Sequence, residues 1–172
     1  LEESDFDRPL GESTGAGVIF GATGGVIEAA VRTAYEVYTK KPLGRLDFTE
    51  LRGMEGIRSA TVDMDGTPVR IGIAHGLAHA RQLAEEVLAG RSPYHAIEIM
   101  ACPGGCIGGG GQPPACNKRK AERAEAIFKA DEACALRIPQ QNPDLGYVYD
   151  TLLQGRAHEL LHIHYPAHGQ HS

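Results

Sequence analysis

The sequence predicts an α/β fold, a mixed sheet flanked by helices. Three observations support this prediction. Apolar residues recur at helical spacing in residues 26–38, 77–88 and 118–137, strand-forming residues alternate on both sides of a two-residue turn at 65–66, and a short apolar strand at 96–100 leads into a glycine-rich loop. A chain of 172 residues is long enough to bury one core, so one α/β domain accounts for the pattern.

The N-terminal third is predicted to contain an arm followed by a long helix. Residues 1–14 are acidic and include Pro9, which indicates a crossing arm or linker. A short apolar segment at 18–20 leads into a glycine-rich turn, where Thr23 is placed to cap the next helix. That helix is predicted to run from 26 to 40, because lysines and a proline follow its last apolar residue.

The middle of the chain is predicted to form a hairpin, a helix and a strand. Residues 57–73 alternate around Asp65-Gly66, which is the turn chemistry of a two-residue hairpin. Residues 77–88 are amphipathic and are followed by Gly90, a residue typical of the position after a helix. The strand at 96–100 then delivers the glycine loop at its C-terminal end, where open α/β sheets place ligands.

Three helical segments are predicted after the loop. Residues 118–137 form a surface helix in which Cys134 fills the core, and shorter helices cover 144–153 and 156–162 with Gly155 between them. Most carboxylates on the predicted helices, including Glu28 and Asp131, are expected to be solvated.

Composition limits the possible partners and compartments. The net charge of -5 argues against nucleic acid or an anionic membrane as partner, since either would require a basic surface. Four cysteines are too few for a disulfide scaffold and favour reduced thiols, so we expect a cytoplasmic protein. The sequence shows neither a signal peptide nor an apolar run that could span a bilayer. Because the chain begins at Leu1 rather than Met, we expect N-terminal sequence to have been removed.

The loop at 100–113 is the most informative segment of the chain. Cys102 and Cys106 lie among glycines, which let the backbone take positive φ values and pass close to a bulky inorganic group. Thiolates are soft ligands that select iron-sulfur clusters, copper(I) or zinc. The alternative is a flexible loop with two idle thiols, because a C-x-x-x-C pair alone is only a moderate signal.

Longer motifs around this loop resemble the [FeFe]-hydrogenases. Residues 100–113 read Met-Ala-Cys-Pro-Gly-Gly-Cys-Ile-Gly-Gly-Gly-Gly-Gln-Pro, close to that family's third signature, M-A-C-x-G-G-C-x-x-G-G-G-Q-P. The segment 12–25 with its helix, and 155–162 near the C-terminus, also agree with the family. The resemblance implies that residues 15–165 are the C-terminal half of the catalytic, H-cluster-binding domain, with 166–172 as a tail.

The resemblance also implies a cofactor and roles for individual residues. The family's H-cluster joins a [4Fe-4S] cluster to a diiron subcluster carrying CO, CN and a bridging dithiolate. Cys102 would then ligate the cubane, and Cys106 would be the thiolate that bridges to the diiron unit. Met100 would lie beside the dithiolate, and Phe20 would pack against the diiron pocket with Gly24, Gly25 and Val26 nearby. The implied reaction is reversible H2 oxidation and proton reduction.

The chain departs from the family in its cysteine supply. A cubane usually has four cysteine ligands, and only Cys102 and Cys106 have a ligand-like context. The family's upstream signatures, of the T-S-C-C-P and P-C-x-x-K type, are absent, and so are its ferredoxin-like electron inlets. A second subunit or segment is therefore expected to carry the remaining cysteines. The expected electron partners are iron-sulfur subunits or ferredoxin, which would make the hydrogenase ferredoxin- or NAD(P)-linked. Either the enzyme is split or this chain is a fragment.

Several alternatives remain beside this interpretation. Cys116 is a possible third ligand, and Glu98 is either a carboxylate near the cofactor or a structural one. Residues His158 to His162 match the H-E-x-x-H zinc-protease pattern, with His168 at the position of a third ligand, although the glycine of the extended pattern is missing. The glycines at 15–25 do not satisfy G-x-G-x-x-G. The alternative function is a noncatalytic iron-sulfur binding or H2-sensing subunit.

Overall fold

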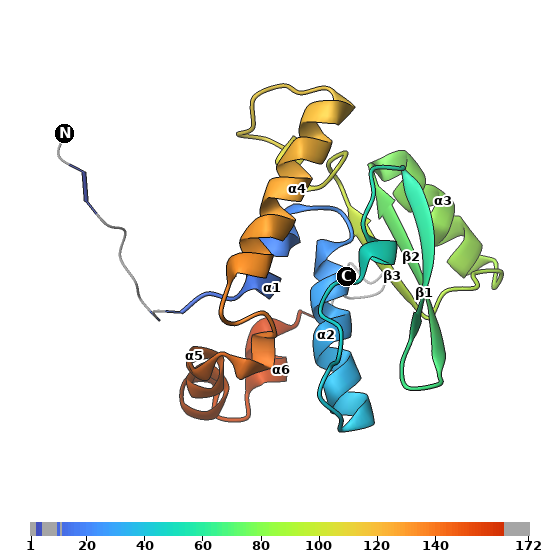
Figure 1. The fold of residues 1–172 in the computed structure, drawn as a ribbon. Helices are drawn as coiled ribbons and strands as arrows, with labels where there is room; N and C mark the ends of the chain where they lie inside the picture. The colour runs from blue at the N-terminus through green and yellow to red at the C-terminus, as the bar shows by residue number, and fades with distance from the viewer. Residues whose placement is uncertain (1–2, 5–9, 11, 164–172) are drawn as a thin grey trace, which may run out of the picture. The chain divides into compact units, whose positions relative to one another are not determined.

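The computed structural model describes residues 3–4, 10 and 12–163, which divide into two compact units (Figure 1). Residues 13–139 form the first unit, and residue 12 with residues 140–163 belong to the second. Most of the predicted arm and the predicted tail at 166–172 lie outside the described residues. At the end of the arm, Thr14 is buried and its Oγ1 accepts a hydrogen bond from the Gly17 amide, so this residue is already part of the first unit.

The first unit is built on a mixed three-stranded sheet with the order β1-β2-β3. The strands are β1 (Ile57–Asp63), β2 (Pro68–His75) and β3 (Ala96–Met100). β1 and β2 are antiparallel and joined at Asp65 and Gly66, whose φ values of 58° and 89° confirm the predicted two-residue hairpin. β3 runs parallel to β2, which places Met100 beside His75 at the strand ends.

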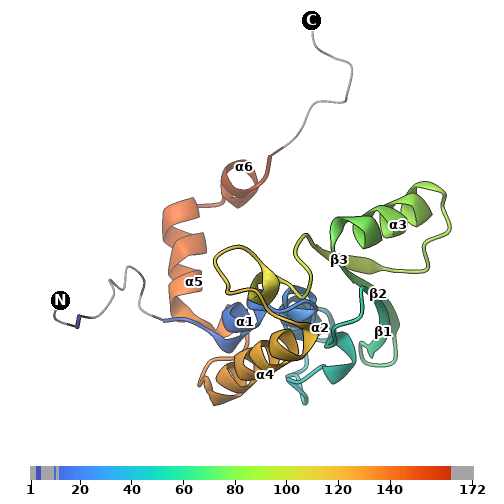
Figure 2. The same cartoon turned by 90° about the horizontal axis from the view of Figure 1, so that it is seen from above.

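Helices cover both faces of this sheet (Figures 1 and 2). α2 (Gly25–Thr39) packs on one face, α3 (Leu77–Leu88) lies on the other, and α1 (Gly15–Val18) and α4 (Asn117–Ala133) lie beyond α2. Both faces of β2 are therefore covered, which explains why its last five residues, 71–75, are all buried. One core cluster contains α2 and sheet residues, among them Val31, Val62 and Ile71, and another joins Ala16, Ile19 and Phe128.

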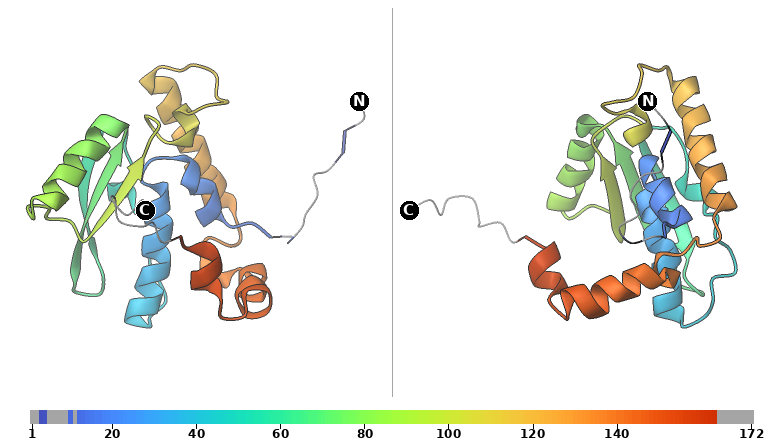
Figure 3. Two further views of the ribbon diagram at one scale, coloured as in Figure 1. Left: turned by 180° about the vertical axis from the view of Figure 1, so that it is seen from behind. Right: turned by 90° about the vertical axis from the view of Figure 1, so that its left-hand side faces the viewer.

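Short helical turns connect these elements, and the described part of the second unit contains further helices. The turns are η1 (Ile19–Gly21), η2 (Thr49–Leu51), η3 (Cys106–Gly108) and η4 (Pro139–Gln141). In the second unit, α5 (Pro143–Tyr147) continues as a π-helical turn, Val148–Leu153, before α6 (Ala157–Leu161), as Figure 3 shows. Gly155, with φ of 78°, separates the two helical segments as predicted.

Two sequence predictions about helix ends are wrong. Thr23 does not cap α2, because Gly24 occupies the N-cap position in a left-handed conformation and no side chain of the cap residue contributes. α4 ends at Ala133, four residues earlier than predicted, and Cys134 is its C-cap residue. The Cys134 thiol is partly exposed and donates to the Ala130 carbonyl at 3.2 Å, so it does not fill the core.

The prediction that Glu28 and Asp131 are solvated is also wrong, because both side chains are fully buried in an ion network. Arg32 lies between them, with its guanidinium nitrogens 2.9 Å from Glu28 and 2.8 Å from Asp131. The network is completed by Arg52, Arg137 and Asp47, which gives three arginines and three carboxylates. A buried charge needs a partner, and these pairs connect α2, α4 and the residues before η2.

Among the described residues, no helix is both long and apolar enough to cross a membrane.

Candidate metal centre

The loop that follows β3 is held in a tight conformation by its own backbone. The Gly105 amide donates to the Cys102 carbonyl at 2.9 Å, and the Gly108 amide donates to the Gly105 carbonyl at 3.0 Å. Gly104 and Gly105 have φ values of 89° and 90°, a region that residues with a side chain rarely adopt. The glycines therefore permit the two cysteines to lie on consecutive turns of one short loop.

Gly105 also allows the loop to pack closely against the start of α2. A Cβ atom on Gly105 would lie 2.8 Å from the Met100 sulfur and 2.9 Å from both the Gly21 carbonyl oxygen and the Thr23 nitrogen. The Thr23 amide donates to the Gly104 carbonyl at 3.1 Å. The structure thus brings together Met100, the cysteine loop and the turn that carries Phe20, Gly24 and Gly25.

The two predicted ligand thiols are free and accessible. Cys102 is partly exposed and Cys106 is exposed, and neither is in a disulfide. Gly109 lies close to Cys102, since a Cβ at this glycine would be 3.1 Å from the Cys102 sulfur. Soft thiolates on a glycine loop fit one side of an iron-sulfur centre.

The described residues do not complete such a centre by themselves. They contain no group of three or more His, Cys, Asp or Glu side chains that could hold a metal ion. Cys116 is exposed at the N-cap of α4, and Cys134 is at the other end of that helix. The loop therefore offers two of the four cysteine ligands that a [4Fe-4S] cluster usually has.

Phe20 and Val26 lie on an apolar groove rather than in the core. The groove has a volume of about 430 Å³, and Phe20 is 47% exposed in it. Beyond Phe20, the groove is lined by Thr33, Pro139 and five apolar side chains of α2 at helical spacing. The five are Val26, Ala29, Ala30, Ala34 and Val37.

Glu98 has a structural role at the start of α2. The sequence alone left open whether it is a structural carboxylate or one near the cofactor. Its carboxylate is 7% exposed and accepts hydrogen bonds from the Gly24 amide at 2.6 Å and the Ile27 amide at 2.8 Å. These amides belong to the first turn of α2, where four backbone donors lack partners within the helix. Glu98 therefore replaces the predicted cap Thr23, whose buried Oγ1 has no hydrogen-bond partner.

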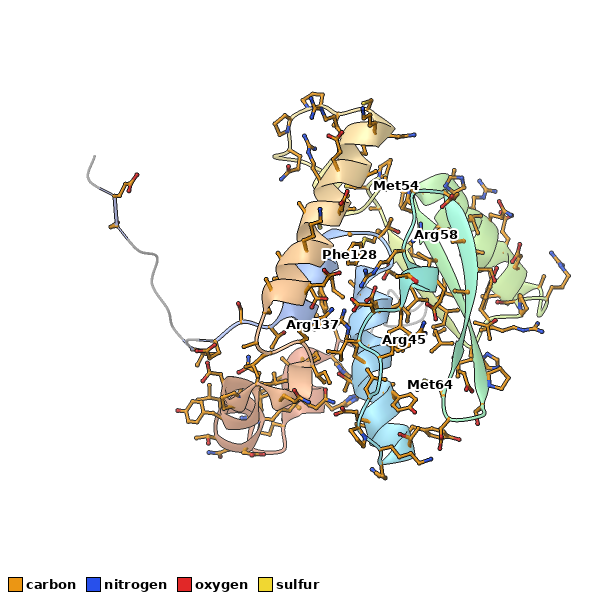
Figure 4. All side chains as sticks on the ribbon, in the orientation of Figure 1. Arg45, Met54, Arg58, Met64, Phe128 and Arg137 are labelled. Atoms are coloured by element: carbon orange, nitrogen blue, oxygen red, sulfur yellow. The ribbon has the colours of Figure 1, made fainter. Side chains whose placement is uncertain are left out.

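Arg58 was not identified from the sequence, although it holds the same turn. Arg58 extends from β1 (Figure 4). Its terminal nitrogen donates to the carbonyls of Thr23 at 3.2 Å and Leu51 at 3.1 Å. Burial lowers the pKa of Arg58, and the nearby charges of Glu55 and Glu98 act in the opposite direction. An arginine on a strand that alternates between faces gives no local signal of such a contact, so only the tertiary structure reveals it.

The H-E-x-x-H segment does not form a zinc-protease site among the described residues. The Nδ1 atoms of His158, on α6, and of His162, its C-cap residue, lie 2.8 Å apart. Glu159, the residue that would act as general base, is instead paired with Arg156 at 2.7 Å. His168 lies outside the described residues.

This arrangement, with free thiols on a glycine loop at the C-terminal end of a strand, is typical of proteins that bind an inorganic centre. Comparison with known proteins gives the family. A family model described as the iron only hydrogenase large subunit, C-terminal domain, matches residues 1–110, and one described as the iron hydrogenase small subunit matches residues 117–168. The chain belongs to the iron-only hydrogenase family.

Individual relatives agree with this assignment. The chain is 47% identical over 171 residues to the NADP-reducing hydrogenase subunit HndD of Solidesulfovibrio fructosivorans, covering 96% of this chain and 29% of that protein. It is 52% identical over 113 residues to the periplasmic [Fe] hydrogenase large subunit of Nitratidesulfovibrio vulgaris, covering 66% of this chain and 27% of that protein. The chain therefore spans less than a third of the length of these curated relatives.

Solved structures and a second group of relatives extend the comparison. The [FeFe]-hydrogenase HydA1 of Chlamydomonas reinhardtii superposes with a TM-score of 0.69 at 40% identity, covering 97% of this chain and 50% of that chain. The cytosolic iron-sulfur assembly component 3 of Mus musculus is 30% identical over 152 residues, covering 86% of this chain and 32% of that protein. Related sequences thus occur in proteins named for hydrogenase activity and for cluster assembly.

Proposed function

We propose that this chain is part of an [FeFe]-hydrogenase that catalyses reversible H2 oxidation and proton reduction at an H-cluster shared with another polypeptide segment. The observation that carries the proposal is the loop at 100–113, which carries two free thiols and, through Gly105, packs against both Met100 and the turn that begins α2. When bound, the cofactor would supply the iron chemistry of H2 activation, while the protein would orient the cofactor and exclude competing reactions.

Each site residue has a proposed role. Cys102 would ligate the [4Fe-4S] cluster, and Cys106 would bridge this cluster to the diiron subcluster with its CO, CN and dithiolate groups. Met100 would contact the dithiolate side of the cofactor. Its sulfur lies beside Gly105, and Gly105 stands between Cys102 and Cys106 in the sequence. Phe20 and Val26, which share the apolar groove, would form a dry wall with Gly24 and Gly25.

The partner would be a polypeptide segment that supplies the remaining cluster cysteines. Two observations support it: only two candidate ligand thiols lie on the loop, and the apolar groove starts at Phe20 and continues along α2. Exposed apolar grooves of this kind mark sites of protein contact. The name of one relative, an NADP-reducing hydrogenase subunit, supports NAD(P)-linked electron transfer, with ferredoxin or an iron-sulfur subunit as the direct donor.

The location we propose is the cytoplasm, where reduced thiols persist. One relative is named as periplasmic, which makes the periplasm the alternative location. Fractionation of the source cells separates the two compartments directly.

The test of the proposal is H2 evolution by the complete, matured hydrogenase that contains this chain, driven by a low-potential donor. We expect Cys106→Ser to abolish H2 evolution and Cys102→Ser to lower the iron content as well. Cys134→Ser is the matched control, because its thiol is bonded to the Ala130 carbonyl on α4, and it should retain both activity and iron.

A second candidate is a noncatalytic iron-sulfur protein, favoured by the 30% identity to the iron-sulfur assembly component. The two candidates give different results in the same assay. A matured complex that contains iron but evolves no H2 would support this second candidate and contradict the hydrogenase proposal.

A further inference from the structure

The first peptide of the α2 turn is held on both sides by charged groups, the buried Glu98 and the half-buried Arg58. The bond between Thr23 and Gly24 offers its carbonyl to Arg58 at 3.2 Å and its amide to Glu98 at 2.6 Å. A third bond runs from the Thr23 amide to the Gly104 carbonyl of the cysteine loop at 3.1 Å. This turn is therefore attached to β1, to β3 and to the cysteine loop.

Glu98 connects the two segments that carry the proposed cofactor contacts. It lies on β3, two positions before Met100 and four before Cys102, so its own strand continues into the cysteine loop. Its two oxygens accept from Gly24 and Ile27, which flank Gly25 and Val26 on the other segment. Hydrogen bonds to a carboxylate are shorter and stronger than bonds between neutral groups.

Close packing at Gly24 also restricts movement of the turn. Its φ is 91°, and a Cβ atom on it would lie 2.1 Å from the Leu51 carbonyl oxygen. Arg58 donates to this same carbonyl. The turn is thus packed against η2 as well as being bonded by the two charged side chains.

We propose that Glu98 and Arg58 form a clasp, in which they act as positioning residues that fix the wall formed by residues 20–26 against the Cys102–Cys106 loop. Neither residue is among the ligands or contacts implied for the cofactor. The clasp acts through the Thr23–Gly24 peptide, so its loss would let the wall shift relative to the loop while both thiols remain. The inference rests on the proposed function only for its effect on the cofactor; the hydrogen bonds themselves are independent of it.

The first experiment needs no cofactor. Amide hydrogen exchange is measured in the full-length protein before maturation, comparing wild type with Glu98→Gln. We expect exchange at Gly24 and Ile27 to accelerate by about tenfold or more relative to the β1–β2 hairpin, because each amide loses a bond to a charged acceptor. Unchanged exchange at both amides would overturn the clasp.

The second experiment reads out the cofactor geometry in the matured enzyme through the infrared bands of the CO and CN groups. We expect the bands to shift or broaden in Glu98→Gln and Arg58→Lys and to return toward wild type in Glu98→Asp, which keeps the charge. Asp131→Asn is the matched control: it removes a buried carboxylate from the ion network and lowers stability without touching the clasp. Equal band shifts in Asp131→Asn would show that any destabilisation suffices and would contradict a positioning role.

The two experiments separate the clasp from the proposed function. Accelerated exchange without any CO or CN bands in the wild-type protein would contradict the hydrogenase proposal and leave the clasp intact. Wild-type bands that do not change in Glu98→Gln would contradict the positioning role and leave the hydrogenase proposal intact.

Discussion

Gly105 and Gly110 belong to the same loop but differ in the space around them. A Cβ atom on Gly105 would lie within 3 Å of Met100, Gly21 and Thr23, whereas nothing lies within 4 Å of such an atom on Gly110. Gly105 also has a positive φ of 90°, which a side chain strains further. At the residue scale, the loop therefore depends on one glycine much more than on the other.

We expect Gly105→Ala to lower the free energy of unfolding by about 1–3 kcal/mol, since it combines overpacking with backbone strain. The same variant should hold less iron after cluster reconstitution, because the loop must move away from the α2 turn. Chemical denaturation and iron analysis measure the two effects. Gly110→Ala should match the wild type in both, and an equal loss in the two variants would contradict the close approach at Gly105.

At the scale of elements, the buried ion network connects α2 to α4 through the pair of Arg32 and Asp131. Burial works to raise the pKa of Asp131, but hydrogen bonds from Arg32 and Arg137 outweigh it and hold the pKa below its usual value. Burial also acts to raise the pKa of Asp47, but hydrogen bonds from Arg137 and Arg52 outweigh it and lower this pKa. The two carboxylates are therefore charged in the folded protein at neutral pH.

These lowered pKa values predict how stability depends on pH. Because the folded protein holds the protons of Asp47 and Asp131 less tightly than the unfolded chain, the stabilisation is complete above the ordinary carboxyl pKa of about 3.9 and is lost as pH falls below it. We expect Asp131→Asn to cost about 3–5 kcal/mol at neutral pH, since it leaves buried arginine charge uncompensated, and to flatten the acid limb. Denaturant unfolding between pH 7 and pH 2 measures both effects.

Glu125→Gln is the matched control for this prediction. Glu125 lies on the same helix and pairs with Lys129, but both side chains are exposed, so solvent screens the pair. Its variant should unfold like the wild type at every pH. A similar loss in the two variants would show that the burial of Asp131 does not matter.

At the scale of the whole molecule, the groove on α2 provides the test for a partner segment. We expect Ala34→Glu to weaken association with the segment that carries the remaining cluster cysteines by about tenfold or more, because an unpaired charge would be buried in an apolar contact. Sedimentation of the mixed chains, or co-purification with the segment, measures this. Leu88→Glu on α3 is the control, since Leu88 is exposed outside the groove, and equal weakening by both variants would contradict this location.

The sequence predicted most elements and the cysteine loop because their signals are local. Asp65-Gly66 sets the hairpin through positive φ values, and Gly90 follows α3 with a φ of 66°. The motif around Cys102 and Cys106 identified the family, which the comparisons confirm. The predicted C-terminal end of α4 and the predicted cap of α2 were wrong. The Leu136 and Arg137 carbonyls, predicted to be helical, accept hydrogen bonds from Gly15 and Arg32, and the start of α2 is bonded by Glu98, so distant residues decide both sites.

What the sequence by itself determined about this protein is most of its helices and strands, its family and the presence of two thiols on a glycine-rich loop. Only the tertiary structure decided which polar side chains are buried and what they hold. Glu98 is separated from Gly24 by 74 positions, and Arg32 from Asp131 by 99. A charged residue on a helix or strand looks the same locally whether it is solvated or paired, and its burial is settled only when distant segments pack together and supply its partner.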